Sequence, residues 1–120
     1  MKALSLQGSE DTPQVVLDRE NGEFVLAGRS LPENAATFYK PILDWLEAYA
    51  QDPNPATVFN FKLDYFNTSS SKMILDILTT LEDIPGARVI WYFHDDDEDM
   101  EEAGEEFSEL VELPFEWKVY

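Results

Sequence analysis

Residues 57–78, TVFNFKLDYFNTSSSKMILDIL, contain the change of hydrophobic period that decides the fold. Up to Tyr65 the apolar residues alternate with polar ones, which is the period of a strand with one buried face. From Ile74 onward the apolar residues recur at the spacing of one helix face. A polar run, Asn67 to Ser71, separates the two patterns. The stretch therefore predicts a strand that leads into a helix through a polar junction.

The sequence before this stretch predicts a hairpin and a helix. Residues 15–29 hold two short apolar runs around Asn21-Gly22, a pair that favours the positive φ angles of a tight hairpin turn. Residues 31–55 follow with an amphipathic helical pattern that has Asn34 as a candidate cap. Pro41 lacks an N–H, so the helix either has this residue near its first turn or bends there.

The sequence after this stretch repeats the alternation of strand and helix. Residues 87–93 are apolar at five consecutive positions, as expected of an inner strand, and a helical pattern and a last alternating segment follow. Strand-helix-strand units close right-handed and give parallel neighbours. We expect an α/β fold in which an N-terminal β-hairpin precedes β-α-β units, with a mixed sheet packed with about three helices. Residues 1–120 are expected to form a single domain.

The composition disfavours several classes of function. Eight Lys and Arg against 25 Asp and Glu give a net charge of −17, which repels nucleic acid and anionic lipid. Cysteine is absent, so disulfides, thiolate metal sites and cysteine nucleophiles are excluded. No window approaches the ~20 apolar residues of a membrane span, and the N-terminus lacks the apolar region of a secretory signal. We expect a cytoplasmic protein that binds neither nucleic acid nor membrane.

Much of the acidity is concentrated in one segment. Residues 94–112 contain eleven acidic residues and no Lys or Arg. His94 and these carboxylates are candidate ligands of a divalent cation, which gives the alternative of a small metal-dependent enzyme. Their order does not fit an EF-hand, and one His without Cys is a poor zinc site. Asp95 to Asp97 suit the first turn of a helix, where negative charge is favoured, so we expect no metal and no other cofactor.

The remaining candidate sites are also interpreted as structural. His94 is the only candidate base for a serine nucleophile, and the chain has no G-x-S-x-G motif. Several aromatic residues fall at the periods of the predicted elements, so we expect them in the core rather than in a ligand site. These are Phe38, Trp45, Phe59, Phe61, Trp91, Phe93 and Trp117.

Four consecutive hydroxyls, Thr68 to Ser71, are more than a helix cap requires. The junction is expected at the carboxyl edge of the sheet, where α/β folds place their sites, and a helix N-terminus attracts anions. A P-loop is excluded because the run has no glycine. Covalent phosphorylation needs only an exposed hydroxyl, and Lys72 supplies a nearby cation. The spacing leaves open the alternative that the run only caps the helix of a constitutive adaptor.

The stretch DYFNTSSSKMILDIL, residues 64–78, resembles the SiaC family of bacterial regulatory phosphoproteins. Leu31-Pro32-Glu33-Asn34 upstream and Trp45 in the first helix extend the resemblance over nearly the whole chain. Its specific part is an Asn-Thr-Ser-Ser core followed by Lys72 and Asp76-Ile77. Members of this family resemble the STAS-like domains of anti-sigma-factor antagonists, so the resemblance implies a STAS-like fold.

The resemblance also implies a non-enzymatic partner switch. A dedicated kinase would phosphorylate Thr68, and a PP2C-type phosphatase would remove the phosphate. The unmodified form would bind and activate a protein partner, such as a diguanylate cyclase. The residues expected to shape the junction and contact partners are Tyr65, Asn67, Ser69, Ser70 and Lys72.

Overall fold

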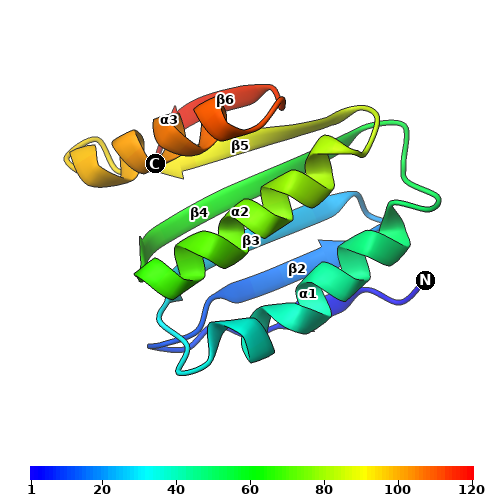
Figure 1. Cartoon of the computed structure of the whole chain (residues 1–120), viewed down its shortest axis with the longest axis horizontal. Helices are drawn as coiled ribbons and strands as arrows, with labels where there is room; N and C mark the ends of the chain where they lie inside the picture. The colour runs from blue at the N-terminus through cyan, green and yellow to red at the C-terminus, as the bar shows by residue number, and fades with distance from the viewer.

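The computed structural model describes residues 1–120, with three helices on one face of a six-stranded sheet (Figure 1). The strands are β1 (Leu4–Leu6), β2 (Gln14–Asp18), β3 (Glu23–Ser30), β4 (Thr57–Phe66), β5 (Ala87–Phe93) and β6 (Phe115–Val119). The helices are α1 (Ala35–Tyr49), α2 (Thr68–Glu82) and α3 (Glu98–Leu110). The element order confirms the predicted α/β fold, and β1 is a strand that the sequence pattern did not predict.

The sheet is mixed, and its strands lie side by side in chain order from β1 to β6. β1, β2 and β3 pair antiparallel, whereas β3, β4, β5 and β6 pair parallel. One helix connects each parallel pair, so the carboxyl ends of these four strands lie at the same edge of the sheet. The junction between β4 and α2 therefore lies at this edge, as the sequence predicts.

Side-chain caps determine where α1 and α3 begin. Asn34 caps α1 as predicted, because its Oδ1 accepts a hydrogen bond from the Thr37 N–H at 3.1 Å. The helix continues through Pro41, which lies well inside it rather than in its first turn. Asp97 caps α3, which begins at Glu98, so Asp95 and Asp96 precede the helix and do not lie in its first turn as predicted. The first turn is acidic nevertheless, because other carboxylates lie at this favourable end of the helix dipole.

The turn between β2 and β3 is longer than the predicted tight turn. Residues 19–22 connect the strands, and of these only Gly22 has a positive φ, of 66°. The Asp18 carboxylate accepts hydrogen bonds from the side-chain and backbone amides of Asn21, at 2.7 and 3.1 Å. These bonds hold the pKa of Asp18 below its ordinary value. Asn21 thus supports the turn by hydrogen bonding rather than by a positive φ.

The core lies between the sheet and the helices, and Trp91 of β5 is its largest fully buried side chain. The Trp91 ring packs on Phe61 and Phe107, with centroids 5.4 and 5.7 Å away. Its Nε1 donates to the Met100 carbonyl of α3 at 3.0 Å. Gly104 faces the same ring, and a Cβ there would lie 2.5 Å from Trp91 Cδ1. The close approach of α3 to β5 therefore requires glycine at this position.

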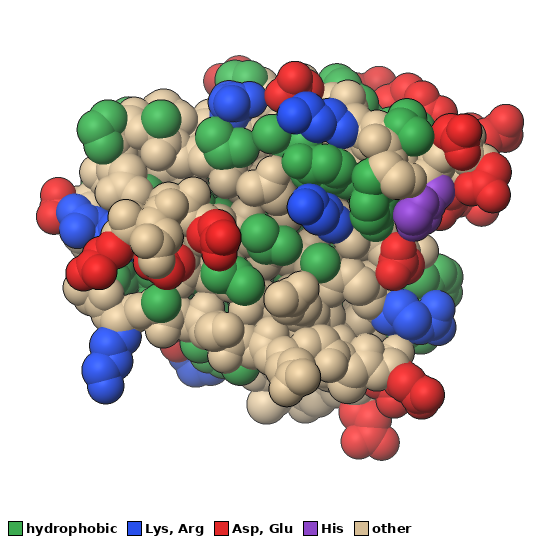
Figure 2. All heavy atoms as spheres, turned by 180° about the vertical axis from the view of Figure 1, so that it is seen from behind, with side chains coloured by type: hydrophobic (Ala, Val, Ile, Leu, Met, Phe, Trp, Pro, Cys, Tyr) green, Lys and Arg blue, Asp and Glu red, His purple; other side chains and the backbone are tan.

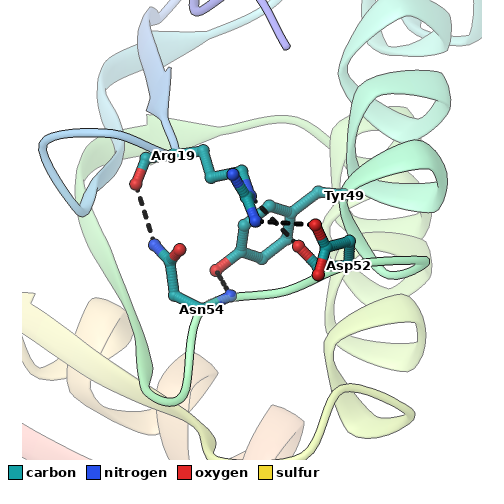
Figure 3. A network of polar contacts seen from close by, with 4 residues as sticks. All are labelled: Arg19, Tyr49, Asp52 and Asn54. Atoms are coloured by element: carbon teal, nitrogen blue, oxygen red, sulfur yellow. Dashed lines mark hydrogen bonds and ion pairs between the residues drawn. The ribbon is translucent and has the colours of Figure 1, made fainter.

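A polar network fixes the turn before β3 to the loop before β4 (Figure 3). Arg19 donates to the Asp52 carboxylate at 2.9 Å and to the Asp52 carbonyl at 3.0 Å. Asn54 donates from its side chain to the Arg19 carbonyl and from its backbone to the Tyr49 hydroxyl, at 2.8 and 3.1 Å. The Tyr49 hydroxyl also bonds the buried Thr57 hydroxyl at 2.7 Å. This network lies at the amino end of β4, opposite the polar junction.

The face of the sheet opposite the helices is open (Figure 2). Hydrophobic side chains form scattered patches on this face, with Lys and Arg side chains among them, and acidic residues gather beside the single histidine at one corner. The prediction that Trp117 lies in the core is wrong, because this residue of the edge strand β6 is 39 % exposed. None of the helices has the length and hydropathy needed to span a membrane.

Candidate functional site

The hydroxyl run forms the first turn of α2, and Asn67 is its N-cap. The Asn67 Oδ1 accepts hydrogen bonds from the Ser70 N–H at 2.9 Å and the Ser69 hydroxyl at 3.3 Å. The Asn67 N–H donates to the Ser30 carbonyl at the end of β3, at 3.0 Å. Asn67 thus satisfies an unpaired amide of the helix and holds the junction against the neighbouring strand. The helix begins at Thr68.

Ser70 lies in a buried chain of hydrogen bonds and not on the surface. Its hydroxyl donates to the Ser30 carbonyl at 3.0 Å and accepts from the Ser30 hydroxyl at 2.8 Å. Because a serine hydroxyl has one proton, the Tyr39 hydroxyl donates to Ser30 Oγ at 2.6 Å. Burial raises the pKa of Tyr39 above its ordinary value, although the bonds with Ser30 and Ser70 oppose this shift.

The expectation that Ser70 contacts partners is therefore corrected. Its side chain is fully buried, as are those of Ser30 and Tyr39, so it is not accessible to another protein. The chain of hydroxyls instead fixes the start of α2 to β3 and α1. No local sequence pattern indicates this role, because Ser30 is 40 residues away.

The other three hydroxyls of the run differ in accessibility. Thr68 and Ser69 are exposed, and Ser69 donates to the cap residue Asn67. Ser71 is half-buried and lines a hollow of which Glu106 is another lining residue. Thr68 is the exposed hydroxyl whose side chain takes no part in the hydrogen bonds of the junction. Its position at the first residue of α2 places it where a negative charge is favoured.

Two cationic side chains lie near the junction. Lys72 is exposed, and its position four residues after Thr68 puts both side chains on the same helix face. Tyr65 is 48 % exposed, and the Arg29 guanidinium carbon lies 5.7 Å from its ring centroid. Arg29 was not predicted as a neighbour of the site. The parallel register of β3 and β4, which aligns Arg29 with Tyr65, brings it there.

A groove opens beside the junction, between the end of β4 and helices α2 and α3. It consists of two hollows, of about 190 and 220 Å³, that share Phe66 and Ala103 as lining residues. Tyr65 lines the first hollow and Ser71 the second, so the groove reaches the junction from one side. Its apolar lining residues and exposed tyrosine are features of a protein-binding surface. The lining also includes the acidic residues Asp64, Asp97, Asp99 and Glu106. The largest hollow, of about 500 Å³, lies between α1 and α2 near Glu47 and is remote from the junction.

His94 follows the carboxyl end of β5, where it contacts Tyr120 and Asp64. Its Nδ1 lies 2.8 Å from the Tyr120 carbonyl oxygen, its Nε2 lies 3.3 Å from Asp64 Oδ1, and its ring stacks on Tyr120. The hydrogen bond to Tyr120 and that to Asp64 raise the pKa of His94 above its ordinary value. No group of three or more His, Asp or Glu side chains has an arrangement that could hold a metal ion. The metal-dependent alternative therefore lacks a set of ligands.

Comparisons with known proteins agree with the resemblance at the junction. Residues 6–120 match the model of the SiaC family, whose members are described as regulatory phosphoproteins. An uncharacterized protein of Pseudomonas aeruginosa strain UCBPP-PA14 is 33 % identical over 119 residues, which cover 96 % of this chain and 94 % of that protein.

Solved structures show the same similarity in three dimensions. The crystal structure of apo-SiaC from Pseudomonas aeruginosa has a TM-score of 0.88 and 31 % identity, covering 98 % of this chain and 99 % of that one. The crystal structure of the diguanylate cyclase SiaD in complex with its activator SiaC, from the same organism, contains a chain with a TM-score of 0.90 and 30 % identity. The match again covers 98 % of this chain and 99 % of that one. With its fold and its sequence matched over almost their full length, this chain belongs to the SiaC family of regulatory phosphoproteins.

Proposed function

We propose that this chain is a non-enzymatic partner switch controlled by phosphorylation of Thr68. A cognate kinase adds the phosphate, a PP2C-type phosphatase removes it, and the unmodified form binds and activates a diguanylate cyclase. The observation that carries the proposal is the exposed, uncommitted hydroxyl of Thr68 at the start of α2. The cyclase is supported by the similar SiaC chain, which is described as the activator of the diguanylate cyclase SiaD.

The start of α2 suits a phosphorylated side chain. Its first turn contains no acidic residue, and the unpaired amides of the helix N-terminus favour a phosphate. Lys72, one turn further along, adds a cation on the same face. These interactions are each worth roughly 0.3 to 1 kcal/mol at an exposed site, so the modified protein should be about as stable as the unmodified one. Ser71 is less suitable, because it is half-buried and lines the same hollow as the acidic Glu106.

A bound partner would experience the same phosphate differently. Burying the phosphate dianion at an interface without a cation costs several kcal/mol. A loss of ~3 kcal/mol weakens binding about a hundredfold. The switch therefore acts on the interface and leaves the fold intact.

The partner surface in this proposal combines the junction with the adjoining groove. Tyr65 and Lys72 present exposed side chains beside Thr68, and Asn67 and Ser69 form the rim of the helix start. Asn67 also caps α2, so its substitution would disturb the fold as well as the surface. Tyr65→Ala and Lys72→Ala are the cleaner tests and should each weaken partner binding by about tenfold or more. Lys40→Ala, on α1, is a matched control with an exposed lysine.

Phosphopeptide mapping tests the acceptor. The protein is incubated with its cognate kinase and ATP, and the modified residue is identified by mass spectrometry. We expect phosphate on Thr68 in the wild type and loss of labelling in Thr68→Ala. Thr79→Ala removes another exposed threonine of α2, whose hydroxyl donates to the Leu75 carbonyl, and should be labelled normally. Most of the phosphate on Ser69 or Ser71 would refute the assignment.

Enzymatically phosphorylated protein tests the switch itself. Its melting temperature and its affinity for the cyclase are compared with those of the unmodified protein. We expect a nearly unchanged melting temperature and an affinity about a hundredfold lower. Unchanged affinity would instead support a constitutive adaptor. A fall of ten degrees or more in melting temperature would show that phosphate acts by unfolding.

A further inference from the structure

The strand β6 is a free edge of the sheet with an exposed apolar side. α3 packs on β4 and β5. Phe115, Trp117 and Val119 alternate along the helix-facing side of β6, because they align with the buried residues of β5. Trp117 is 39 % exposed and Val119 is 58 % exposed. Such an edge can pair with another strand unless the protein prevents it.

Two hydrogen bonds show which backbone groups of β6 remain unpaired. The Val89 N–H donates to the Pro114 carbonyl at 2.9 Å, and the Tyr120 N–H donates to the Phe93 carbonyl at 3.1 Å. Backbone groups of successive residues in a strand point to opposite sides of it. Residues 114, 116, 118 and 120 therefore face β5. The N–H and carbonyl groups of residues 115, 117 and 119 point outward from the sheet.

We propose that two copies of this chain pair through β6, antiparallel, about a two-fold axis at Trp117. In this register Trp117 lies opposite Trp117 of the second copy, and Phe115 lies opposite Val119 of the second copy. Each pair consists of residues with outward backbone groups, so every outward N–H meets an outward carbonyl. The two sheets become continuous, and the exposed apolar side chains of both edge strands pack together on the helix-facing side.

The charges on the other side of β6 select the same register. Glu116 lies opposite Lys118 of the second copy, and the two-fold axis repeats this attractive pair. Sliding one copy by two residues would place Glu116 opposite Glu116 or Lys118 opposite Lys118, and like charges directly opposite are destabilising. Sliding one copy by one residue would place the outward N–H and carbonyl groups of one β6 opposite residues of the other β6 whose backbone groups already bond β5. Glu116 already pairs with Arg88 at 3.3 Å, whereas Lys118 has no ion pair within its own chain.

This self-complementarity favours a second copy over an unrelated strand. The other edge, β1, has only three residues, Leu4–Leu6, and offers a much shorter ladder. The net charge of −17 on each copy opposes association, and at about 0.15 M salt this repulsion is screened beyond about 8 Å. The dimer should therefore form more readily at physiological salt than at low salt. It does not depend on the modification of Thr68, which lies on α2.

Sedimentation velocity with charge-swapped variants tests the proposal. The wild type should sediment as a 13.8 kDa monomer when dilute and as a dimer at about 200 μM in 0.15 M salt. Glu116→Lys and Lys118→Glu each place like charges opposite one another, so each should weaken dimerisation at least about tenfold. An equimolar mixture of these two variants should dimerise again, because each mixed pair then joins Lys to Glu. A wild type that stays monomeric throughout, or a mixture no better than its separate components, overturns the proposal.

Hydrogen exchange gives a second test that depends on the backbone. Amides of residues 115, 117 and 119 should exchange quickly in dilute protein and become protected as the dimer forms. Amides of Glu116 and Lys118, which face β5, should be protected at both concentrations. Trp117→Pro removes an outward N–H and no bond to β5, so it should abolish the dimer while the monomer still melts cooperatively. Protection that does not change with concentration would refute pairing at this edge.

Discussion

The substitution Ser70→Ala tests whether Ser70, unlike the exposed hydroxyls of the run, stabilises the fold. In the structure the Tyr39 hydroxyl donates to Ser30, the Ser30 hydroxyl donates to Ser70, and the Ser70 hydroxyl donates to the Ser30 carbonyl. Alanine at position 70 removes the acceptor of the Ser30 hydroxyl. The Ser30 carbonyl keeps its bond from the Asn67 N–H, so one buried hydroxyl proton loses its partner.

A buried donor without a partner costs about 1 to 3 kcal/mol, because water cannot replace the lost acceptor. We therefore expect Ser70→Ala to lower the free energy of unfolding by about 2 kcal/mol. In a chain of 120 residues this corresponds to a melting temperature lower by roughly 6 to 12 °C. The matched control is Ser69→Ala, at an exposed position of the same turn, which should change stability by less than about 0.5 kcal/mol.

Urea denaturation and thermal melting of Ser70→Ala, Ser30→Ala and the double variant measure these costs. The two single effects should not add, because both substitutions interrupt the same chain of hydrogen bonds. Equal stabilities of Ser69→Ala and Ser70→Ala would refute the structural role of Ser70. Additive effects in the double variant would refute a shared chain.

Three other positions give independent expectations. The pKa of His94, followed by NMR, should lie above 6.5, and Asp64→Asn should lower it, with the Tyr120 carbonyl bond retained. Because the pKa of His94 is raised in the folded state, its contribution to stability is full below pH 6.5. This contribution is lost as the pH rises through the folded-state pKa. A free energy of unfolding that does not change between pH 5 and 8 would contradict this expectation. Gly104→Ala places a Cβ against the buried Trp91 indole and should lower the free energy of unfolding, measured by urea denaturation, by about 1 to 3 kcal/mol. A variant as stable as the wild type would show that α3 can shift away from β5 without cost. Tyr49→Phe removes the hydroxyl that bonds Thr57 and the Asn54 amide at the amino end of β4, so it should lower the free energy of unfolding by about 1 to 2 kcal/mol. Phosphorylation of Thr68 by the kinase should proceed at the wild-type rate. Slower phosphorylation would indicate that the two ends of β4 are coupled.

Local sequence patterns were sufficient for the elements and for the place of the junction. The alternation in residues 57–66 and the helical spacing that follows depend only on which side chains can share a buried face. The cap at Asn34 was also predicted, because a cap bonds an amide only three residues away. Asn67 was expected to shape the helix start, and the structure shows that it does so as the cap of α2. The position of Thr68 at a strand-to-helix junction was predicted from the local change of hydrophobic period.

The tertiary structure decided which side chains are covered and which remain free. Ser70 and Thr68 are both hydroxyls of one helical turn, but β3 and α1 bring Ser30 and Tyr39 onto Ser70 alone. Trp117 follows a core-like period, but β6 is the last strand of the sheet, so the residue remains partly exposed. A period along the chain shows which residues share a face, whereas only the packing of distant segments determines what lies against that face.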